Sequence, residues 1–353
     1  SVTSAQTAAV ANVNDNPVGL PVITGTVTED QTLTADTSGI SDDDGLGAFS
    51  YQWLRDGVVI VGATNSTYTL GDADVGTQIS VQVTYTDAHS TAESVTSAQT
   101  AAVANVNDNP VGLPVITGTV TEDQTLTADT SGISDDDGLG AFSYQWLRDG
   151  SVIAGATNST YTLGDADVGT QISVQVTYTD AHSTAESVTS AQTASVLNVN
   201  DAPTGSVAID NMTPNEGDTL TASNTLADTD GMGIVTYQWQ RDGVDIAGGT
   251  GSTYTTVQAD VGTVITVIAT YTDGHGTLET VTSAATAAVG NVNNAPTGSV
   301  TISGTPTEDQ TLTAANSLAD VDGMGVISYQ WQRDGVDIAG ATTSTYTLGD
   351  TDV

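Results

Sequence analysis

The stretch Tyr51-Gln52-Trp53-Leu54-Arg55-Asp56-Gly57 decides the fold, because the chain repeats it three more times with little change. The later copies are Tyr144–Gly150, Tyr237–Gly243 and Tyr329–Gly335. Each copy holds one tryptophan and one arginine, and the chain has no other tryptophan, arginine or lysine. One aromatic anchor and one cation per period of about 93 residues indicate one small domain per period, and therefore a tandem array.

The net charge of the chain argues against nucleic acid as a partner. The 353 residues include 4 Lys+Arg and 43 Asp+Glu, for a formal net charge of −39. We expect no nucleic-acid partner, because the chain lacks the cations that would replace nucleic-acid counterions. Such a charge also repels itself within compact domains unless something neutralises it.

Cysteine is absent, and no apolar run approaches 18 residues. Extracellular Ig-type arrays of eukaryotes usually carry disulfides, which this chain cannot form. The lack of cysteine, the acidity and the richness in Thr, Asp and Gly together point to an extracellular or surface protein of bacteria. We expect no membrane insertion by this segment. No signal peptide is recognisable, and the sequence starts and stops in mid-pattern, so we interpret it as a window from a longer protein.

The repeat boundaries are predicted from short Asn/Asp clusters that end in proline and break regular structure. Residues 1–93 and 94–186 differ only at Val58 against Ser151 and Val61 against Ala154. The clusters are Asn12–Pro17, Asn105–Pro110, Asn198–Pro203 and Asn291–Pro296. We predict the last strand and linker of a preceding repeat at 1–16, full repeats at 17–109, 110–202 and 203–295, and a truncated repeat at 296–353.

Within one repeat the pattern predicts strands only. Residues 78–86 alternate, with Ile79, Val81, Val83 and Tyr85 on one face, which is typical of a half-buried strand. Further strands are expected at 21–24, 31–35, 49–55, 58–61, 66–70 and 95–103. About seven short strands with a tryptophan on the third predict an all-β, Ig-like Greek-key sandwich. Trp53 is expected to fill the space between its sheets.

Several motifs carry a resemblance to known families. The Tyr-Gln-Trp-Leu-Arg-Asp-Gly stretch, residues 62–70 and Ala73-Asp-Val-Gly76 resemble the Ig-like repeats of bacterial surface proteins. The linker Asn-Val-Asn-Asp-Asn-Pro and the loops 227–231 and 319–323 resemble the calcium-binding linkers and Asp-x-Asp loops of cadherins. The combination is similar to the repeat regions of large calcium-dependent, RTX-type adhesins of Gram-negative bacteria. The resemblance implies calcium between repeats.

Acidic side chains gather at both ends of each predicted sandwich. Because loops alternate between two ends, the C-terminal end of one repeat should face the N-terminal end of the next, with the linker between them. The candidate ligands at the N-terminal ends are Asp42, Asp43, Asp44, Asp87, Asp135, Asp136, Asp137, Asp180, Asp228, Asp230, Asp273, Asp320 and Asp322. Those at the C-terminal ends are Glu29, Asp30, Asp72, Asp74, Glu122, Asp123, Asp165, Asp167 and Glu216. Those in the linkers are Asn14, Asp15, Asn107, Asp108, Asn200, Asp201 and Asn293.

Oxygen-only ligands in this number match Ca²⁺, which takes six to eight oxygens, rather than Zn²⁺. The alternative interpretation is that the acids only keep turn-rich loops soluble. In the third repeat Gln258 and Asn294 replace acids, so we expect its junction to bind fewer ions or to bind them more weakly.

Other side chains have structural interpretations. Arg55 is expected to pair with Asp72 or Asp74. His89, His182 and His275 recur without the further soft ligands that a transition-metal site needs. Catalytic motifs and cysteine nucleophiles are absent, so we do not expect an enzyme.

The predicted function is a structural extender of an extracellular adhesin or surface fibre, stiffened by Ca²⁺ between neighbouring repeats and serving attachment or biofilm formation. One alternative is the subunit of a filament that self-associates by strand exchange. The other is an array of carbohydrate-binding modules, which would require exposed aromatic side chains.

Overall fold

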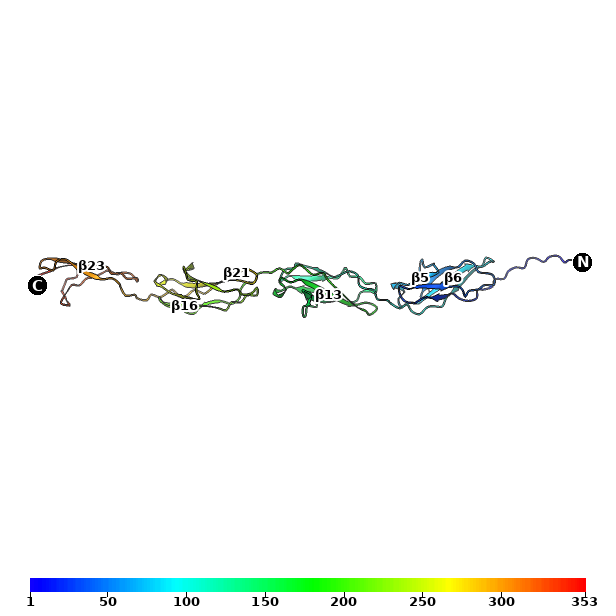
Figure 1. Ribbon diagram of the computed structural model, residues 1–353, viewed down its shortest axis with the longest axis horizontal. Coiled ribbons are helices and arrows are strands. Elements are labelled where there is room, and N and C mark those ends of the chain that lie inside the picture. Colours follow the sequence, from blue (N-terminus) through cyan, green and yellow to red (C-terminus); the bar gives the residue numbers. More distant parts are fainter. The chain divides into compact units, whose positions relative to one another are not determined.

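The computed structural model describes residues 1–353 and is almost entirely β-structure, with 26 strands and four 3₁₀ turns of three residues. Two compact units divide the chain, residues 1–198 and 199–353. Both are built from small antiparallel β-sandwiches, as the strand ribbons show (Figure 1). This is the expected fold class, a tandem array of Ig-like sandwiches. None of the helices has the length and apolar character needed to cross a membrane.

The first repeat forms two facing sheets in the orders β1-β2-β5 and β4-β3-β6-β7. Its elements are β1 (Val22–Thr24), β2 (Thr32–Asp36), β3 (Ser50–Arg55), β4 (Val58–Val59), β5 (Thr67–Thr69), η1 (Asp72–Asp74), β6 (Ile79–Thr86) and β7 (Ala92–Thr96).

The second repeat has the same two sheets, β8-β9-β12 and β11-β10-β13-β14. Its elements are β8 (Val115–Thr117), β9 (Thr125–Asp129), β10 (Ser143–Arg148), β11 (Ser151–Val152), β12 (Thr160–Thr162), η2 (Asp165–Asp167), β13 (Ile172–Thr179) and β14 (Ala185–Thr189).

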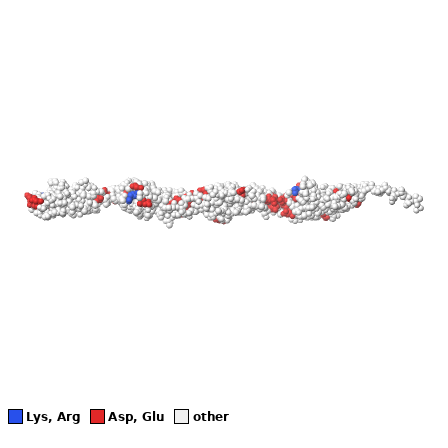
Figure 2. Space-filling view, turned by 90° about the horizontal axis from the view of Figure 1, so that it is seen from above, with Lys and Arg blue, Asp and Glu red and all other residues white.

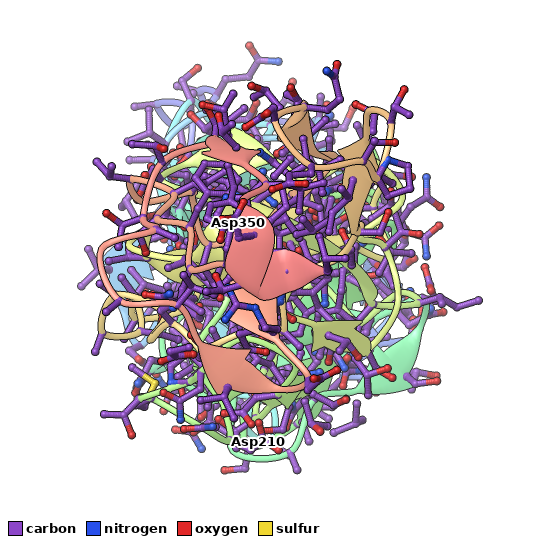
Figure 3. All side chains as sticks on the ribbon, turned by 90° about the vertical axis from the view of Figure 1, so that its left-hand side faces the viewer. Asp210 and Asp350 are labelled. Atoms are coloured by element: carbon purple, nitrogen blue, oxygen red, sulfur yellow. The ribbon has the colours of Figure 1, made fainter.

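The C-terminal unit contains the third repeat, with sheets β15-β16-β19 and β18-β17-β20-β21, and the strands that follow it. The third repeat comprises β15 (Val207–Ile209), β16 (Thr219–Asn224), β17 (Thr236–Arg241), β18 (Val244–Asp245), β19 (Thr253–Thr255), η3 (Gln258–Asp260), β20 (Ile265–Thr272) and β21 (Leu278–Thr282). The fourth comprises β22 (Val300–Ser303), β23 (Thr311–Asn316), β24 (Gln332–Arg333), β25 (Val336–Asp337), β26 (Thr345–Thr347) and η4 (Asp350–Asp352). Asp210, which follows β15, and Asp350, which begins η4, are labelled in Figure 3.

The tryptophan of each complete repeat is the centre of its core, as expected. Trp53 is fully buried and lies opposite Val81 in the β3–β6 ladder. Its indole Nε1 donates a hydrogen bond to the carbonyl of Asn65 at 2.9 Å, and its ring stacks on Tyr68 with centroids 5.8 Å apart. A large ring with its one polar atom satisfied fills the space between two small sheets.

The alternation predicted for residues 78–86 is confirmed in β6. Ile79, Val81 and Val83 are fully buried, and Tyr85 is nearly so. Ser80, on the opposite face, is also buried. We attribute this to the central position of β6 between β3 and β7, where a small side chain is shielded by the neighbouring strands.

The strand expected at 95–103 is wrong in its extent. Strand β7 ends at Thr96, and only isolated bridges follow, among them Gln78 with Ala102 and Val75 with Val103. The hydroxyls of Ser97 and Thr100 accept hydrogen bonds from the N–H groups of Val81 and Ile79, each at 3.0 Å. Side-chain oxygens thus replace backbone carbonyls, and the regular ladder ends.

Candidate metal centre

The linker that follows the first repeat lies directly against Glu29, in the loop between β1 and β2. The N–H of Glu29 donates to the carbonyl of Ala104 at 2.9 Å, and the N–H of Val106 donates to Glu29 Oε2 at 3.1 Å. These bonds hold a carboxylate with no exposed surface beside the linker. Burial, followed by interactions with Asp72 and Asp108, raises the pKa of Glu29, although the Val106 hydrogen bond lowers it.

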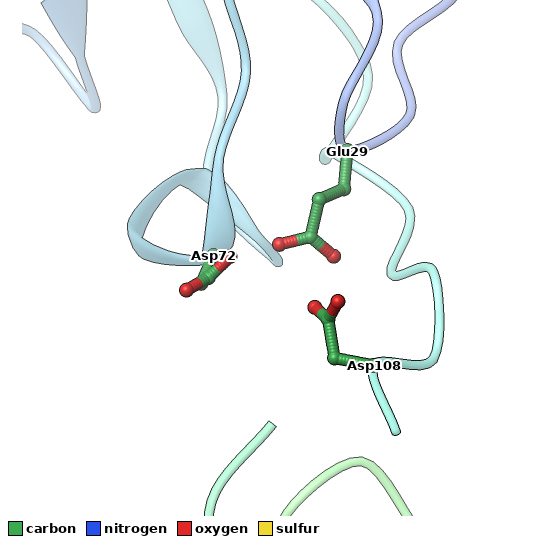
Figure 4. Close-up of side chains that lie close together, drawn as sticks. All are labelled: Glu29, Asp72 and Asp108. Atoms are coloured by element: carbon green, nitrogen blue, oxygen red, sulfur yellow. The ribbon is translucent and has the colours of Figure 1, made fainter. Parts of the chain in front are cut away.

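Three carboxylates converge at this point. One oxygen each of Glu29, Asp72 and Asp108 lies within 4.8 Å of the other two. Figure 4 shows the three side chains directed at one another, Glu29 from its loop, Asp72 from the start of η1 and Asp108 from the linker. These three residues were predicted to lie at one junction, and in the structure they are close enough together to bind one ion.

The second repeat contributes the other side of the group. The backbone N–H of Asp108 donates to Asp137 Oδ2 at 2.7 Å. Burial raises the pKa of Asp108, and the charges of Asp137, Asp72, Asp136 and Asp30 raise it further. Figure 2 shows a dense group of acidic side chains where the first repeat meets the second, with few basic side chains in view. Acids of two repeats and a linker therefore surround one small region.

Two oxygens in this region are buried and have no hydrogen-bond partner, Glu29 Oε1 and Asn105 Oδ1. Leaving a buried polar atom unpaired costs about 1–3 kcal/mol, and more when the atom carries charge. A hard cation held by Glu29, Asp72 and Asp108 would satisfy Glu29 Oε1 and neutralise the surrounding carboxylates, so this donor set fits Ca²⁺. Asn105 was absent from the predicted ligands. Its recurrence as the first residue of every linker was the signal that could have identified it.

The arginines cannot neutralise this group, because each is already paired. Arg55 Nε and Nη2 both bind Asp74 Oδ1 at 2.7 Å. Asp74 Oδ2 accepts from the Tyr68 hydroxyl at 2.8 Å and from the Gly71 N–H at 3.0 Å. The expected arginine pairing is confirmed, with Asp74 as the partner. Asp74 and its equivalent Asp167 are also predicted ligands, and in the structure both of their oxygens accept hydrogen bonds from the protein.

The acids at the N-terminal end of each repeat hold the incoming linker, and in the second repeat they join the group described above. In the first repeat the N–H of Asp15 donates to Asp44 at 2.8 Å, and the Tyr85 hydroxyl donates to Asp42 at 2.5 Å. Asp87 Oδ1 accepts from the N–H groups of His89 and Thr91, whereas Asp87 Oδ2 is buried without a partner. Equivalent contacts join Asp108 to Asp137, Asp201 to Asp230, Tyr178 to Asp135 and Tyr271 to Asp228.

The remaining predicted ligands fall into three groups by exposure. Glu216, Asp320 and Asp322 are half-buried. Glu122, Asp180, Asp230 and Asp273 are buried. Asp30, Asp43, Asp72, Asp123, Asp136, Asp165 and Asn293 are exposed.

A glutamate on the last strand of each complete repeat was missed. The linker amides of Asn14, Asn107 and Asn200 donate to Glu93, Glu186 and Glu279, each at 2.9 Å. These bonds use the asparagine nitrogen and leave its oxygen directed elsewhere. Recurrence of a glutamate at the same place in three repeats was the available signal.

Burial of the tryptophans bears on the carbohydrate alternative. Trp53, Trp146 and Trp239 have no exposed surface, and Trp331 is 8% exposed. Their rings therefore offer no face on which a sugar would stack.

Comparison with known proteins adds fold-level likeness only. No family model matches the chain, and neither does any curated protein. Among solved structures, the chain is similar to a Ca²⁺-stabilised adhesin that helps an Antarctic bacterium reach out and bind ice, at 16% identity and a TM-score of 0.28, covering 80% of this chain and 76% of that one.

Two other solved structures show the same kind of likeness. A 1.5-MDa bacterial ice-binding adhesin is similar at 14% identity and a TM-score of 0.25, over 78% of this chain and 99% of that one. The ICAM-5 D1–D4 ectodomain fragment is similar at 13% identity and a TM-score of 0.38, over 76% and 73%. At these identities and TM-scores the likeness assigns no function.

Proposed function

We propose that this chain is part of the extending stalk of a bacterial surface adhesin, in which Ca²⁺ bound between consecutive repeats restrains their relative motion. Each of the three complete repeats is a small sandwich with its own core. The role proposed for the array is mechanical, namely to hold an adhesive module away from an extracellular surface during attachment or biofilm formation.

The observation that carries this proposal is the convergence of Glu29, Asp72 and Asp108, with Asp137 bonded to the Asp108 backbone. Glu29 and Asp72 belong to one repeat, Asp108 to the linker and Asp137 to the next repeat. An ion held by this set would connect two repeats through their shared linker.

Calcium is preferred among common ions because of the ligand chemistry. The three converging atoms are all carboxylate oxygens, and the nearby imidazole of His182 contacts Asp137 Oδ1 at 3.3 Å. Ca²⁺ accepts six to eight such oxygens in irregular arrangements, whereas Mg²⁺ demands a near-ideal octahedron. Bound Ca²⁺ would offset the repulsion among these acids, which is strong when several like charges share a partly buried region. Glu29, Asp72, Asp108 and Asn105 are the residues proposed to hold it.

Small-angle X-ray scattering of the whole chain tests the mechanical role. The maximum dimension and the shape of the scattering curve are expected to indicate a stiffer, more extended particle in millimolar Ca²⁺ than in excess EDTA. The Asp72→Asn/Asp108→Asn variant should lose part of that difference, whereas Asp245→Asn, an exposed acid on β18, should retain all of it. Scattering curves that coincide with and without chelator would count against the proposal.

A further inference from the structure

The junction between the third and fourth repeats lies within the C-terminal unit and has a different composition from the junction between the first and second. Around the linker between the first and second repeats, at 105–110, there are seven acids: Glu29, Asp30, Asp72, Asp108, Asp135, Asp136 and Asp137. Around the linker between the third and fourth repeats, at 291–296, only three of the equivalent positions are acids. These positions are Glu216, Gly217, Gln258, Asn294, Asp320, Val321 and Asp322. The charge that would demand a cation is therefore more than halved.

Two of the replacements are amides that contact the remaining glutamate. The Asn294 side-chain nitrogen donates to Glu216 Oε1 and Oε2 at 3.4 and 3.3 Å. With the Gln258 amide oriented to satisfy its neighbours, its nitrogen donates to the same two oxygens at 3.2 and 3.0 Å and to Asp322 at 3.3 Å. Glu29 accepts one hydrogen bond from the linker, whereas Glu216 accepts several on both oxygens.

The linker backbone is docked as it is at the first junction. The N–H of Asn294 donates to Asp322 Oδ2, which matches the bond from Asp108 to Asp137. The N–H of Glu216 donates to the carbonyl of Gly290 at 2.9 Å. Two of the backbone contacts that dock the linker at the first junction therefore persist here, although four acids are lost.

A second pair of replacements accompanies the amides. Asn215 and Gly290 stand where the first repeat has Thr28 and Ala104, and the two pairs form the same bridge. A Cβ at Gly290 would lie 2.3 Å from Asn215 Oδ1, so the asparagine side chain occupies the space that the Ala104 methyl group fills at the first junction. No buried oxygen without a partner remains at Glu216 or Asn294, in contrast to Glu29 at the first junction.

We propose that the third junction closes by hydrogen bonds from Gln258 and Asn294 to Glu216 and needs no bound ion, so that the array contains calcium-dependent and calcium-independent junctions. The amide N–H groups of the two side chains take the place of the cation. The statement that other junctions depend on calcium rests on the proposed function. The statement that amide hydrogen bonds close the third junction does not. The consequence is that calcium removal loosens the chain at selected junctions and leaves the third closed.

Hydrogen exchange of the whole chain, followed by mass spectrometry of peptides spanning residues 284–297, tests closure without metal. This sequence is unique in the chain, so its peptides can be assigned. Exchange in this segment is expected to be the same in Ca²⁺ and in EDTA. In EDTA, Asn294→Ala and Gln258→Ala should each accelerate it about 5–10-fold, which is the scale of one or two partly exposed hydrogen bonds to a charged group. Accelerated exchange of the wild-type segment on chelation, or no effect of either alanine, would overturn the inference.

Calcium stoichiometry of the whole chain, measured by isothermal titration calorimetry, tests the role of the amides. The variant Gly217→Asp/Gln258→Asp/Asn294→Asp restores three of the four acids that this junction lacks relative to the first, and it should bind one more Ca²⁺ than wild type. Unchanged stoichiometry in that variant would overturn the inference, unless wild type binds no calcium at all. In that case the proposed function fails, and the exchange measurement in EDTA still decides whether amides close the third junction.

Discussion

Removing the carboxylate of Asp260 should destabilise the third repeat more than removing any exposed acid. Asp260 has no exposed surface and accepts four hydrogen bonds. Arg241 Nε and Nη2 bind Oδ1 at 2.6 Å, and the Tyr254 hydroxyl and Val257 N–H bind Oδ2 at 2.6 and 2.7 Å. Asp260→Ala leaves all four donors without this acceptor.

The magnitude follows from the exposure of the partners. Breaking a buried ion pair by removing one partner costs about 3–5 kcal/mol. The Arg241 side chain is 32% exposed and regains water, so we take about 2–3 kcal/mol for the pair. The hydrogen bonds lost by Tyr254 and Val257 add about 1 kcal/mol each. The total, about 4–5 kcal/mol, is a large share of the roughly 5–15 kcal/mol that stabilises a domain.

Native-state hydrogen exchange measures this change repeat by repeat. Peptides covering β20 in the third repeat should exchange about 10³-fold faster or more in Asp260→Ala, since 1.4 kcal/mol corresponds to a factor of ten. Peptides of the first repeat should be unaffected. Asp245→Ala is the matched control, because it removes the same charge from an exposed pair with Gln240 and should change exchange less than about threefold. Equal effects of the two substitutions would refute the view that this carboxylate anchors the repeat.

Two further outcomes follow from the core and from the tyrosines. Leu220→Ala, at a fully buried position, should lower the free energy of unfolding of the third repeat by about 2–5 kcal/mol, measured in urea. Leu278→Ala, where the side chain is 66% exposed, should lower it by less than about 0.5 kcal/mol. Similar losses in the two variants would contradict the assigned core. Burial and its hydrogen bond to Asp260 raise the pKa of Tyr254 to about 12, above the usual value of about 10. The stability that the neutral Tyr254 side chain contributes should therefore be complete below pH about 10 and be lost as pH rises through about 12. Absorbance at 295 nm should show tyrosines of wild type that ionise at unusually high pH, and one fewer such tyrosine in Tyr254→Phe.

The fold was predictable because its determinants are local and repeated. The alternation in β6 defines one face of a sheet, and the tryptophan on β3 defines the core it packs against. The same pattern recurs in each repeat, so one strand that is ambiguous in the sequence does not change the predicted fold. The end of β7 was not predictable from alternation, because the Ser97 and Thr100 hydroxyls compete with backbone carbonyls only after the strands are aligned.

The candidate site was predictable in composition and only partly in detail. Acidic loops and the linker could be placed at the same end of a repeat from topology alone, which brought Glu29, Asp72 and Asp108 together. The sequence did not distinguish acids that face the junction from an acid such as Asp74, whose oxygens are used within its own repeat. That distinction depends on side-chain direction, which the spacing of residues does not determine. The assignment of the predicted ligands to calcium stays a prediction.

Isothermal titration of the whole chain with Ca²⁺ tests the central claim most directly, by comparing the wild type with the Asp72→Asn/Asp108→Asn variant. The three converging carboxylates lead us to expect saturable binding by the wild type and a stoichiometry lower by one ion in the variant. Equal stoichiometries, or no heat of binding by the wild type at millimolar Ca²⁺, would contradict the claim that Glu29, Asp72 and Asp108 hold a calcium ion between two repeats.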